Sequence, residues 1–147
     1  MLIDTIDLDL KNAMKERNEV KVSTLRMLKA ALTNKLIERK EKALSDDITT
    51  EVIQKQAKQR KESIEEFRKG SRQDLIEKET KELAILEKYL PKQLDETELK
   101  ALIQKAIQST GAKTKADIGK IMKELMPQVK GKADGKEINR IAGSFLL

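Results

Sequence analysis

Apolar residues recur along most of the chain at spacings of three and four, which places them on one side of an α-helix. The first such stripe begins at Ile3 and returns at Ile6 and Leu10. A longer stripe over residues 20–43 consists of Leu25, Leu28, Leu32 and Leu36. No stretch alternates apolar with polar side chains and is also rich in β-branched or aromatic residues, as an exposed strand would be. The pattern therefore predicts an all-α protein.

Two further stripes extend this pattern to Pro91. Ser45 can cap the third helix, and Gly70 is predicted to end it, with Ser71 as the next cap. The fourth stripe runs up to Pro91, which cannot continue a helix. Four helices with short connections predict an N-terminal, four-helix bundle-like subdomain over residues 1–94.

A small three-helix tail subdomain is predicted over residues 95–147. Asp95 can cap its first helix, and Thr114 begins a sequence with the spacing of a capping box. Proline disfavours the α conformation in the residue before it, so Pro127 predicts that the next helix ends at Met126.

The connection before the last helix contains Gly131 and Gly135. Glycine adopts a positive φ at little steric cost, and we expect at least one of these two residues to do so. Asp134 can cap the last helix, with Glu137 three positions later as in a capping box. This part of the chain therefore reads as a helix, a glycine-containing turn and a second helix.

The composition limits the chemistry that the chain can perform. It contains no Cys and no His, which excludes disulfides, thiolate metal sites and the commonest general base. We therefore expect no metal, no cofactor and no catalytic residue. The chain has neither a signal peptide nor a long apolar run, which predicts no contact with a membrane and a cytoplasmic location.

Several polar residues were weighed as candidates for chemistry. The adjacent acidic pairs at 46–47 and 65–66 are best interpreted as solvated carboxylates. Tyr89 is expected to pack where the fourth helix ends. Arg60 falls on the third apolar stripe, where its stem can lie along the edge of the core while its guanidinium stays in water.

Lysines are concentrated in the tail. Seven lysines stand against three acidic residues over 111–136, a local excess of +4 out of a net charge of +6 for the chain. Such a surface is either a solubilising face or a surface that contacts phosphates, and the charge pattern alone favours neither. No aromatic platform for stacking bases accompanies it, so a nucleic acid bound here would be recognised by backbone and shape, as structured RNA is. The candidate nucleic-acid-binding residues are Lys113, Lys115, Lys120, Lys123, Lys130, Lys132 and Lys136.

Residues 119–127 and 131–135 resemble the signature of the GatB/YqeY family, whose motif positions here are Gly119, Pro127, Gly131, Asp134 and Gly135. The similarity extends to residues 89–94 and 26–30 and covers essentially the whole chain. The chain resembles the small free-standing YqeY-type members, and its tail resembles the C-terminal region of the B subunit of the tRNA-dependent amidotransferase.

The resemblance implies the same two-part helical arrangement and a non-catalytic, tRNA-binding function, because the tail of the B subunit helps to hold tRNA near its elbow. The implied partners are tRNA or another structured RNA, and an aminoacyl-tRNA-related enzyme. One alternative is a protein-interaction adaptor. Another is the family-level label of a carbon–nitrogen ligase with glutamine as amido donor. The chain is too short for the catalytic cradle of the B subunit, so enzymatic activity is not expected of it alone.

Overall fold

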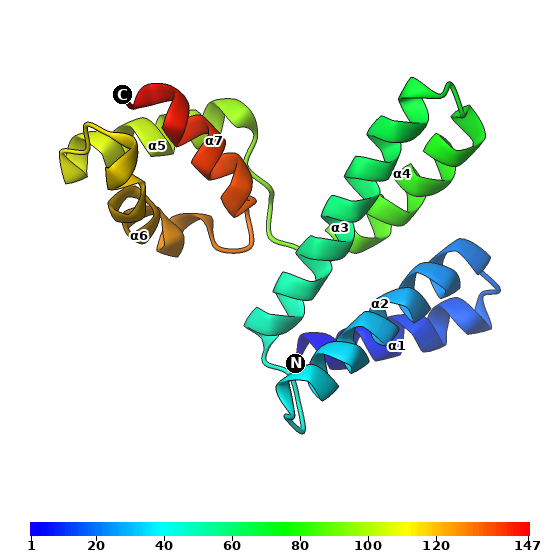
Figure 1. Ribbon diagram of the computed structural model, residues 1–147. Coiled ribbons are helices and arrows are strands. Elements are labelled where there is room, and N and C mark those ends of the chain that lie inside the picture. Colours follow the sequence, from blue (N-terminus) through cyan, green and yellow to red (C-terminus); the bar gives the residue numbers. More distant parts are fainter. The chain divides into compact units, whose positions relative to one another are not determined.

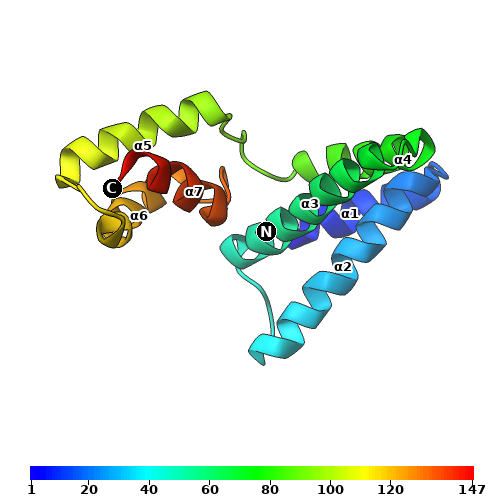
Figure 2. The same cartoon turned by 45° about the horizontal axis from the view of Figure 1, so that its top comes forward.

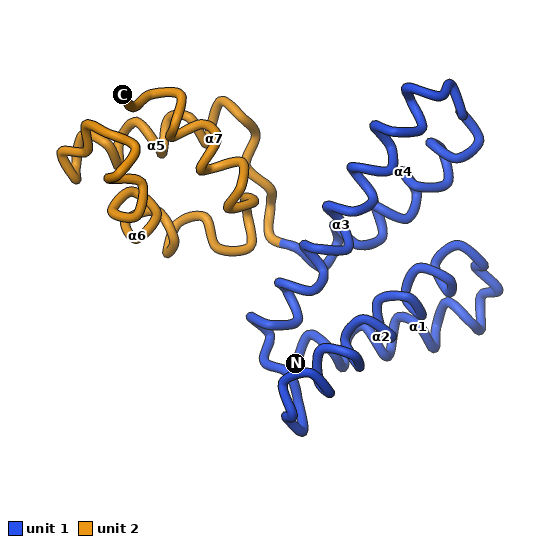
Figure 3. The backbone as a smooth tube through the Cα atoms, viewed as in Figure 1, with its two compact units in different colours: residues 1–90 blue, residues 91–147 orange.

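The computed structural model describes residues 1–147 as α-helices and one short 3₁₀ helix, without a strand (Figure 1). The prediction of an all-α protein is confirmed. The chain divides into two compact units, Met1–Leu90 and Pro91–Leu147 (Figure 3). This division lies before the boundary predicted after residue 94, because Leu94 packs against the core of the second unit. None of the helices combines the length and the apolar character needed to cross a lipid bilayer.

The first unit consists of two antiparallel helical hairpins (Figures 1 and 2). Its helices are α1 (Leu2–Lys15), α2 (Glu19–Arg39), α3 (Asp46–Lys69) and α4 (Gln73–Glu87). Each helix contributes to one shared core, which includes Ile6, Leu28, Ile53 and Leu86. All four of these side chains are at most 1% exposed. The apolar stripes of the sequence are thus the faces along which the helices pack.

Three helix ends of the first unit are closed by a non-glycine residue with a left-handed backbone. Arg17, Lys40 and Ser71 have φ values of 56°, 54° and 56°. Lys40 ends α2 earlier than the predicted residue 43. The predicted stop, Gly70, has φ −89°, and Ser71 rather than Gly70 turns the chain. The amide of Arg72 then donates to the Phe67 carbonyl at 3.0 Å, as in a Schellman motif, and Arg72 instead of Ser71 precedes α4.

The expected position of Arg60 at the wet edge of the core is wrong. Arg60 is only 8% exposed, and its Nε lies 2.9 Å from Glu82 Oε2 and 3.5 Å from Glu79 Oε2. One guanidinium nitrogen also donates to Met27 Sδ at 3.5 Å. Burial and the neighbouring Glu82 raise the pKa of Glu79. Arg60 on α3 thus contacts α2 through Met27 and α4 through Glu79 and Glu82.

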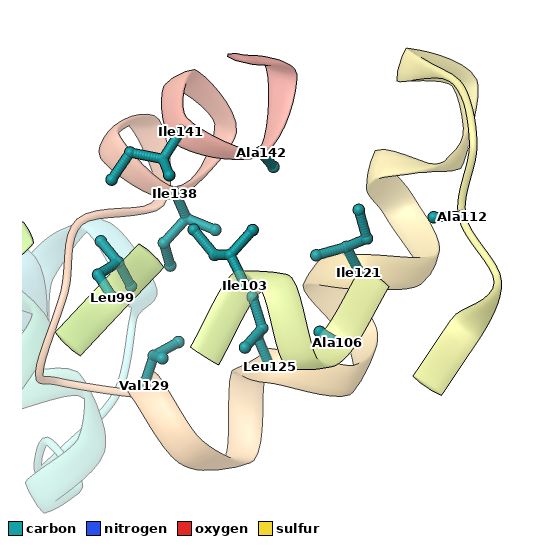
Figure 4. Packing of buried hydrophobic residues seen from close by; sticks show 10 residues of the cluster. All are labelled: Leu99, Ile103, Ala106, Ala112, Ile121, Leu125, Val129, Ile138, Ile141 and Ala142. Carbon is teal, nitrogen blue, oxygen red and sulfur yellow. The ribbon is translucent and has the colours of Figure 1, made fainter. Parts of the chain in front are cut away.

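The second unit packs three helices and a 3₁₀ turn around its own core (Figure 4). Its elements are α5 (Glu96–Thr110), η1 (Lys115–Asp117), α6 (Ile118–Val129) and α7 (Gly135–Phe145). Ile103, Leu125 and Ile138 converge from the three helices, each at most 1% exposed.

The predicted end of α6 at Met126 is wrong, because the helix continues through Pro127 to Val129. Pro127 is exposed, so its ring meets solvent rather than the core. Val129 is 1% exposed, and burying its side chain favours one further helical turn. The Lys130 amide still donates to the Met126 carbonyl at 3.0 Å. The proline therefore removes one donor without stopping the helix.

The predicted caps of the second unit are mostly confirmed. Asp95 Oδ1 accepts from the Glu98 amide at 2.7 Å, and Glu98 Oε2 accepts from the Asp95 amide at 3.1 Å. Asp134 caps α7 by accepting from the Lys136 amide at 3.3 Å. The capping box predicted with Glu137 does not form, because that carboxylate binds Arg140 on the next turn instead.

Replacing Arg60 by Leu should destabilise the first unit by about 3–5 kcal/mol, because it leaves Glu79 and Glu82 buried without their cation. Urea unfolding monitored by circular dichroism measures this. The control is Lys61→Leu, since Lys61 is exposed and its ion pair with Glu87 is long, at 3.9 Å. That change should alter the free energy of unfolding by no more than about 0.5 kcal/mol. Equal unfolding midpoints for the two variants would contradict the prediction.

Candidate nucleic-acid interface

The turn between α6 and α7 is tight and its backbone is specified by Gly131. Gly131 is buried and has φ +76°, which confirms the expectation of a positive φ in this turn. The amides of Lys132 and Ala133 both donate to the Val129 carbonyl, at 2.8 and 3.2 Å. Gly135 is already the first residue of α7 and does not have a positive φ. Lys130 and Lys132 are therefore exposed on a short, closed loop.

The segment that enters the second unit braces this turn from outside. Gln93 Nε2 donates to the carbonyl oxygens of Gly131, at 2.8 Å, and Pro91, at 2.9 Å. The Leu94 amide donates to the Lys132 carbonyl at 3.0 Å. The two stretches that carried the family resemblance, 89–94 and 131–135, are thus in direct contact.

Sequence reasoning left Lys92 out of the site. The structure places its backbone next to Gln93, beside the turn, and its side chain is exposed. In the sequence, Lys92 stands out only by its position inside the family-like stretch 89–94. This position does not show that the stretch contacts the turn at Gly131, so Lys92 could not be assigned to the site from the sequence.

The predicted lysines are all exposed, and they lie on three segments. Lys130, Lys132 and Lys136 are brought together by the turn and the first residues of α7. Lys120 and Lys123 lie on α6, away from the face that Ile121 and Leu125 bury. Of the remaining two, Lys113 belongs to the loop after α5, and Lys115 is the first residue of η1.

The loop that carries Lys113 and Lys115 is fastened at both ends. The Leu147 amide donates to the Lys113 carbonyl at 3.3 Å, and the Lys115 amide donates to the Leu147 carbonyl at 3.4 Å. Asp117 Oδ2 accepts from the amides of Lys113 and Thr114, at 3.0 and 3.2 Å. These bonds, with a smaller contribution from Lys120, lower the pKa of Asp117. The carboxylate therefore shapes the loop and has a structural role.

Most of the candidate ammonium groups are available to an external anion. Lys120 Nζ lies 3.7 Å from Asp117 Oδ1, a surface ion pair of little strength. The candidates that form no ion pair with an acidic residue are Lys113, Lys115, Lys123, Lys132 and Lys136.

Two of the family-like positions have no packing role inside the unit. Gly119 is the second residue of α6, and a Cβ added there would meet no heavy atom within 4 Å. Gly119 and Lys123 are four residues apart and share a helix face. Pro127 is likewise exposed. The open surface of α6 thus combines positive charge with closely accessible backbone.

The acidic residues weighed earlier have structural contacts. Asp46 Oδ1 accepts from the Leu2 amide at 2.9 Å, and Glu66 Oε1 lies 3.2 Å from Lys69 Nζ. The Tyr89 hydroxyl donates to Asp9 Oδ2 at 2.5 Å, and burial together with this bond raises the pKa of Tyr89. No group of three or more acidic side chains is arranged to hold a metal ion.

Comparison with known proteins confirms the family resemblance. A family model described as Yqey-like protein matches residues 3–146. Three relatives carry the name "Altered inheritance of mitochondria protein 41, mitochondrial". The one from Pyrenophora tritici-repentis is 33% identical over 140 residues, covering 93% of this chain and 76% of that protein. The one from Kluyveromyces lactis is 42% identical over 81 residues, covering 55% and 44%. The Saccharomyces cerevisiae (strain YJM789) protein is 33% identical over 130 residues, covering 88% and 61%.

These relatives contradict the predicted cytoplasmic location, because each of them is named as a mitochondrial protein. The prediction had rested on the lack of a signal peptide and of a long apolar run. An apolar run is needed for insertion into a membrane, and its absence does not identify a compartment. The cytoplasmic location is therefore withdrawn.

Replacing Gly131 by Ala should destabilise the second unit by about 1 kcal/mol or more, because a side chain at φ +76° is strained. The matched change is Gly135→Ala, which has an ordinary backbone and only Met122 Cε at 4.0 Å from the added Cβ. That change should be neutral or slightly stabilising. Thermal unfolding of both variants measures the difference, and a Gly131→Ala variant as stable as Gly135→Ala would refute the strain.

Replacing Asp117 by Asn should reduce the stability of the second unit at neutral pH but not in strong acid. Hydrogen bonds hold the pKa of Asp117 in the folded chain below its ordinary value of 3.8. Its stabilising contribution is therefore present above about pH 4 and is lost as the pH falls through the lowered pKa. Unfolding of both proteins between pH 7 and pH 2 tests this. A stability difference that stays constant over the whole range would contradict it.

Proposed function

The chain belongs to the YqeY-like family, and we propose that it is a non-catalytic module that binds tRNA through the backbone phosphates. The observation that carries the proposal is the braced turn at Gly131, which presents Lys130, Lys132 and Lys136 on one short segment. In the proposed complex the tRNA elbow faces this turn, as the resemblance to the amidotransferase tail suggests. An aminoacyl-tRNA-related enzyme would be the natural protein partner.

The charge of the second unit supports contact with phosphates. Residues 111–136 carry seven lysines against three acids, a local excess of +4. Lysine ammonium groups on flexible stems act as point charges that can follow a phosphate backbone without a fixed geometry. This kind of contact gives affinity and orientation but little base specificity.

The scarcity of aromatic residues supports recognition of a structured RNA. Phe145 is the one aromatic residue of the second unit, and it is not part of the basic turn. Single-stranded bases are usually held by stacking on aromatic rings. A surface of lysines and accessible backbone is better suited to the phosphates and shape of a folded RNA such as tRNA.

A catalytic role, such as the carbon–nitrogen ligase activity with glutamine as amido donor, has less support. Asp46, Asp117 and Glu66 have hydrogen-bond or ion-pair partners that account for them, and the chain contains no His or Cys. A ligase would need a nucleophile or a general base positioned next to a substrate pocket.

A protein-interaction adaptor is the second candidate. Three large apolar side chains of the second unit are exposed, Met126 by 44%, Phe145 by 41% and the terminal Leu147 by 94%. Exposed apolar residues of this size can dock on a partner protein. Such docking would depend little on salt, whereas binding through phosphates weakens steeply as salt rises.

The test replaces Lys130, Lys132 and Lys136 together by Ala in the full-length chain and measures tRNA affinity over a series of salt concentrations. Each phosphate contact contributes about 0.9 to the slope of log affinity against log salt on a duplex. The variant should therefore bind more weakly, with a slope flatter by about two to three units. The fold should be retained, because the three side chains are exposed.

The matched control replaces Lys11, Lys42 and Lys81, which are exposed on the first unit and form no ion pair. Both triple variants lose the same charge, so a nonspecific field effect would weaken binding equally. Equal effects, or no tRNA binding by the wild type at low salt, would refute the proposal and favour the adaptor. ATP- and glutamine-dependent amidation by the purified chain would instead favour the ligase.

A further inference from the structure

The segment 91–94 is fixed against the basic turn before α5 begins. Two successive carbonyl groups of the turn, those of Gly131 and Lys132, accept hydrogen bonds from Gln93 and Leu94. The Leu94 side chain also packs against the core of the second unit. The position of this segment relative to the turn is therefore set by three contacts that are independent of the charges on the surface.

Lys92 lies within this fixed segment. Consecutive Cα atoms are 3.8 Å apart, so the Cα of Lys92 is at most about 8 Å from that of Leu94. The Leu94 amide nitrogen is itself 3.0 Å from the Lys132 carbonyl oxygen. Lys92 is exposed and forms no ion pair. Double-stranded DNA carries one charge per about 1.7 Å of its axis, and a double-helical RNA backbone is a comparable polyanion, so lysines on adjoining segments of the chain can reach neighbouring phosphates.

We infer that Lys92 is a further phosphate-contacting residue of the proposed RNA surface, and that Gln93 is the residue that positions it. The inference rests on the proposed function and adds to it a contact from outside the lysine-rich stretch. The site is then formed by two segments of the chain, which the hydrogen bond between Gln93 and Gly131 joins across 38 residues of sequence.

Gln93 is suited to this role by its amide group. An NH₂ group has two hydrogens, and Gln93 Nε2 uses them on two carbonyl oxygens, those of Pro91 and Gly131. The bond to Pro91 folds the side chain back over its own segment, and the bond to Gly131 joins that segment to the turn. Removing the amide takes away the two hydrogen bonds of Gln93, while the contacts of Leu94 remain. No charge changes, so the loss of position can be separated from the loss of charge.

The experiment measures the affinity of the full chain for tRNA between 50 and 200 mM salt, for wild type, Lys92→Ala, Lys92→Arg and Lys105→Ala. Lys105 is an exposed lysine of α5 that forms no ion pair, and it serves as the matched control. If Lys92 contacts one phosphate, the ratio of the wild-type affinity to the Lys92→Ala affinity should fall by about threefold between the lowest and the highest salt concentration. Lys92→Arg should retain the wild-type slope, and Lys105→Ala should retain both affinity and slope.

The Gln93→Ala variant tests whether Gln93 positions Lys92, because its effect on tRNA binding should then depend on the presence of the Lys92 side chain. It should flatten the salt slope when Lys92 is present and leave the slope unchanged in a chain that already carries Lys92→Ala. A purely structural role for Gln93 would weaken binding equally in both backgrounds. Circular dichroism verifies that each variant is folded. If Gln93→Ala does not fold, the comparison of Lys92→Ala with Lys105→Ala still decides whether Lys92 contacts a phosphate.

The proposed function stands if the triple variant of Lys130, Lys132 and Lys136 still loses affinity for tRNA. In that case the inference about Lys92 is overturned by either of two results. Lys92→Ala binds tRNA like Lys105→Ala, or Gln93→Ala has the same effect whether or not Lys92 is present. A wild-type chain that binds no tRNA at low salt overturns both. The two failures are thereby distinguished within one set of measurements.

Discussion

The second unit depends on the two carbonyl groups that Gly131 and Lys132 offer to the segment entering it. Gln93 and Leu94 donate to these groups, and Leu94 adds its side chain to the core. The carbonyl of Gly131 is presented by a backbone with φ +76°, which a residue with a side chain adopts only under strain. One glycine thus determines the turn and the docking of the entering segment. The lysines gain their common location from this backbone arrangement, not from contacts among themselves.

A small unit with an excess of positive charge needs such constraints. Domains of about sixty residues bury a limited fraction of their surface and are only marginally stable. Like charges on the surface of the second unit repel one another, and this repulsion opposes the compact state. Asp117 offsets part of it where two amides and Lys120 surround its carboxylate. In the first unit the local balance is reversed, since one cation, Arg60, lies beside two acids, the buried Glu82 and the half-buried Glu79.

The features that could be predicted from the sequence are those that depend on residues close together in the chain. The caps at Asp95 and Asp134 depend on residues two or three positions away, and both were predicted. The spacing on α3 places Arg60 on the apolar stripe, but its charge suggested solvent for the guanidinium, because the partners Glu79 and Glu82 come from another helix. The helix ends at Lys40 and Ser71 use non-glycine residues in the left-handed conformation, which residue preference assigns to glycine, so residue type alone does not locate these ends. Lys92 was missed for the same reason as Arg60, because its neighbours come from a distant part of the chain.

Gly119 and Gly131 illustrate two different reasons for a glycine on this surface. The fold itself accounts for Gly131, because a residue with a side chain adopts its φ of +76° only under strain. The fold gives no such account of Gly119, because the space around a side chain at this position is open. Under the proposed function, that space is where an RNA backbone comes close to the helix, next to Lys123 on the same face. The lack of a side chain at Gly119 would then let the RNA backbone approach α6 more closely than a larger residue would, which gives this glycine a reason outside the fold.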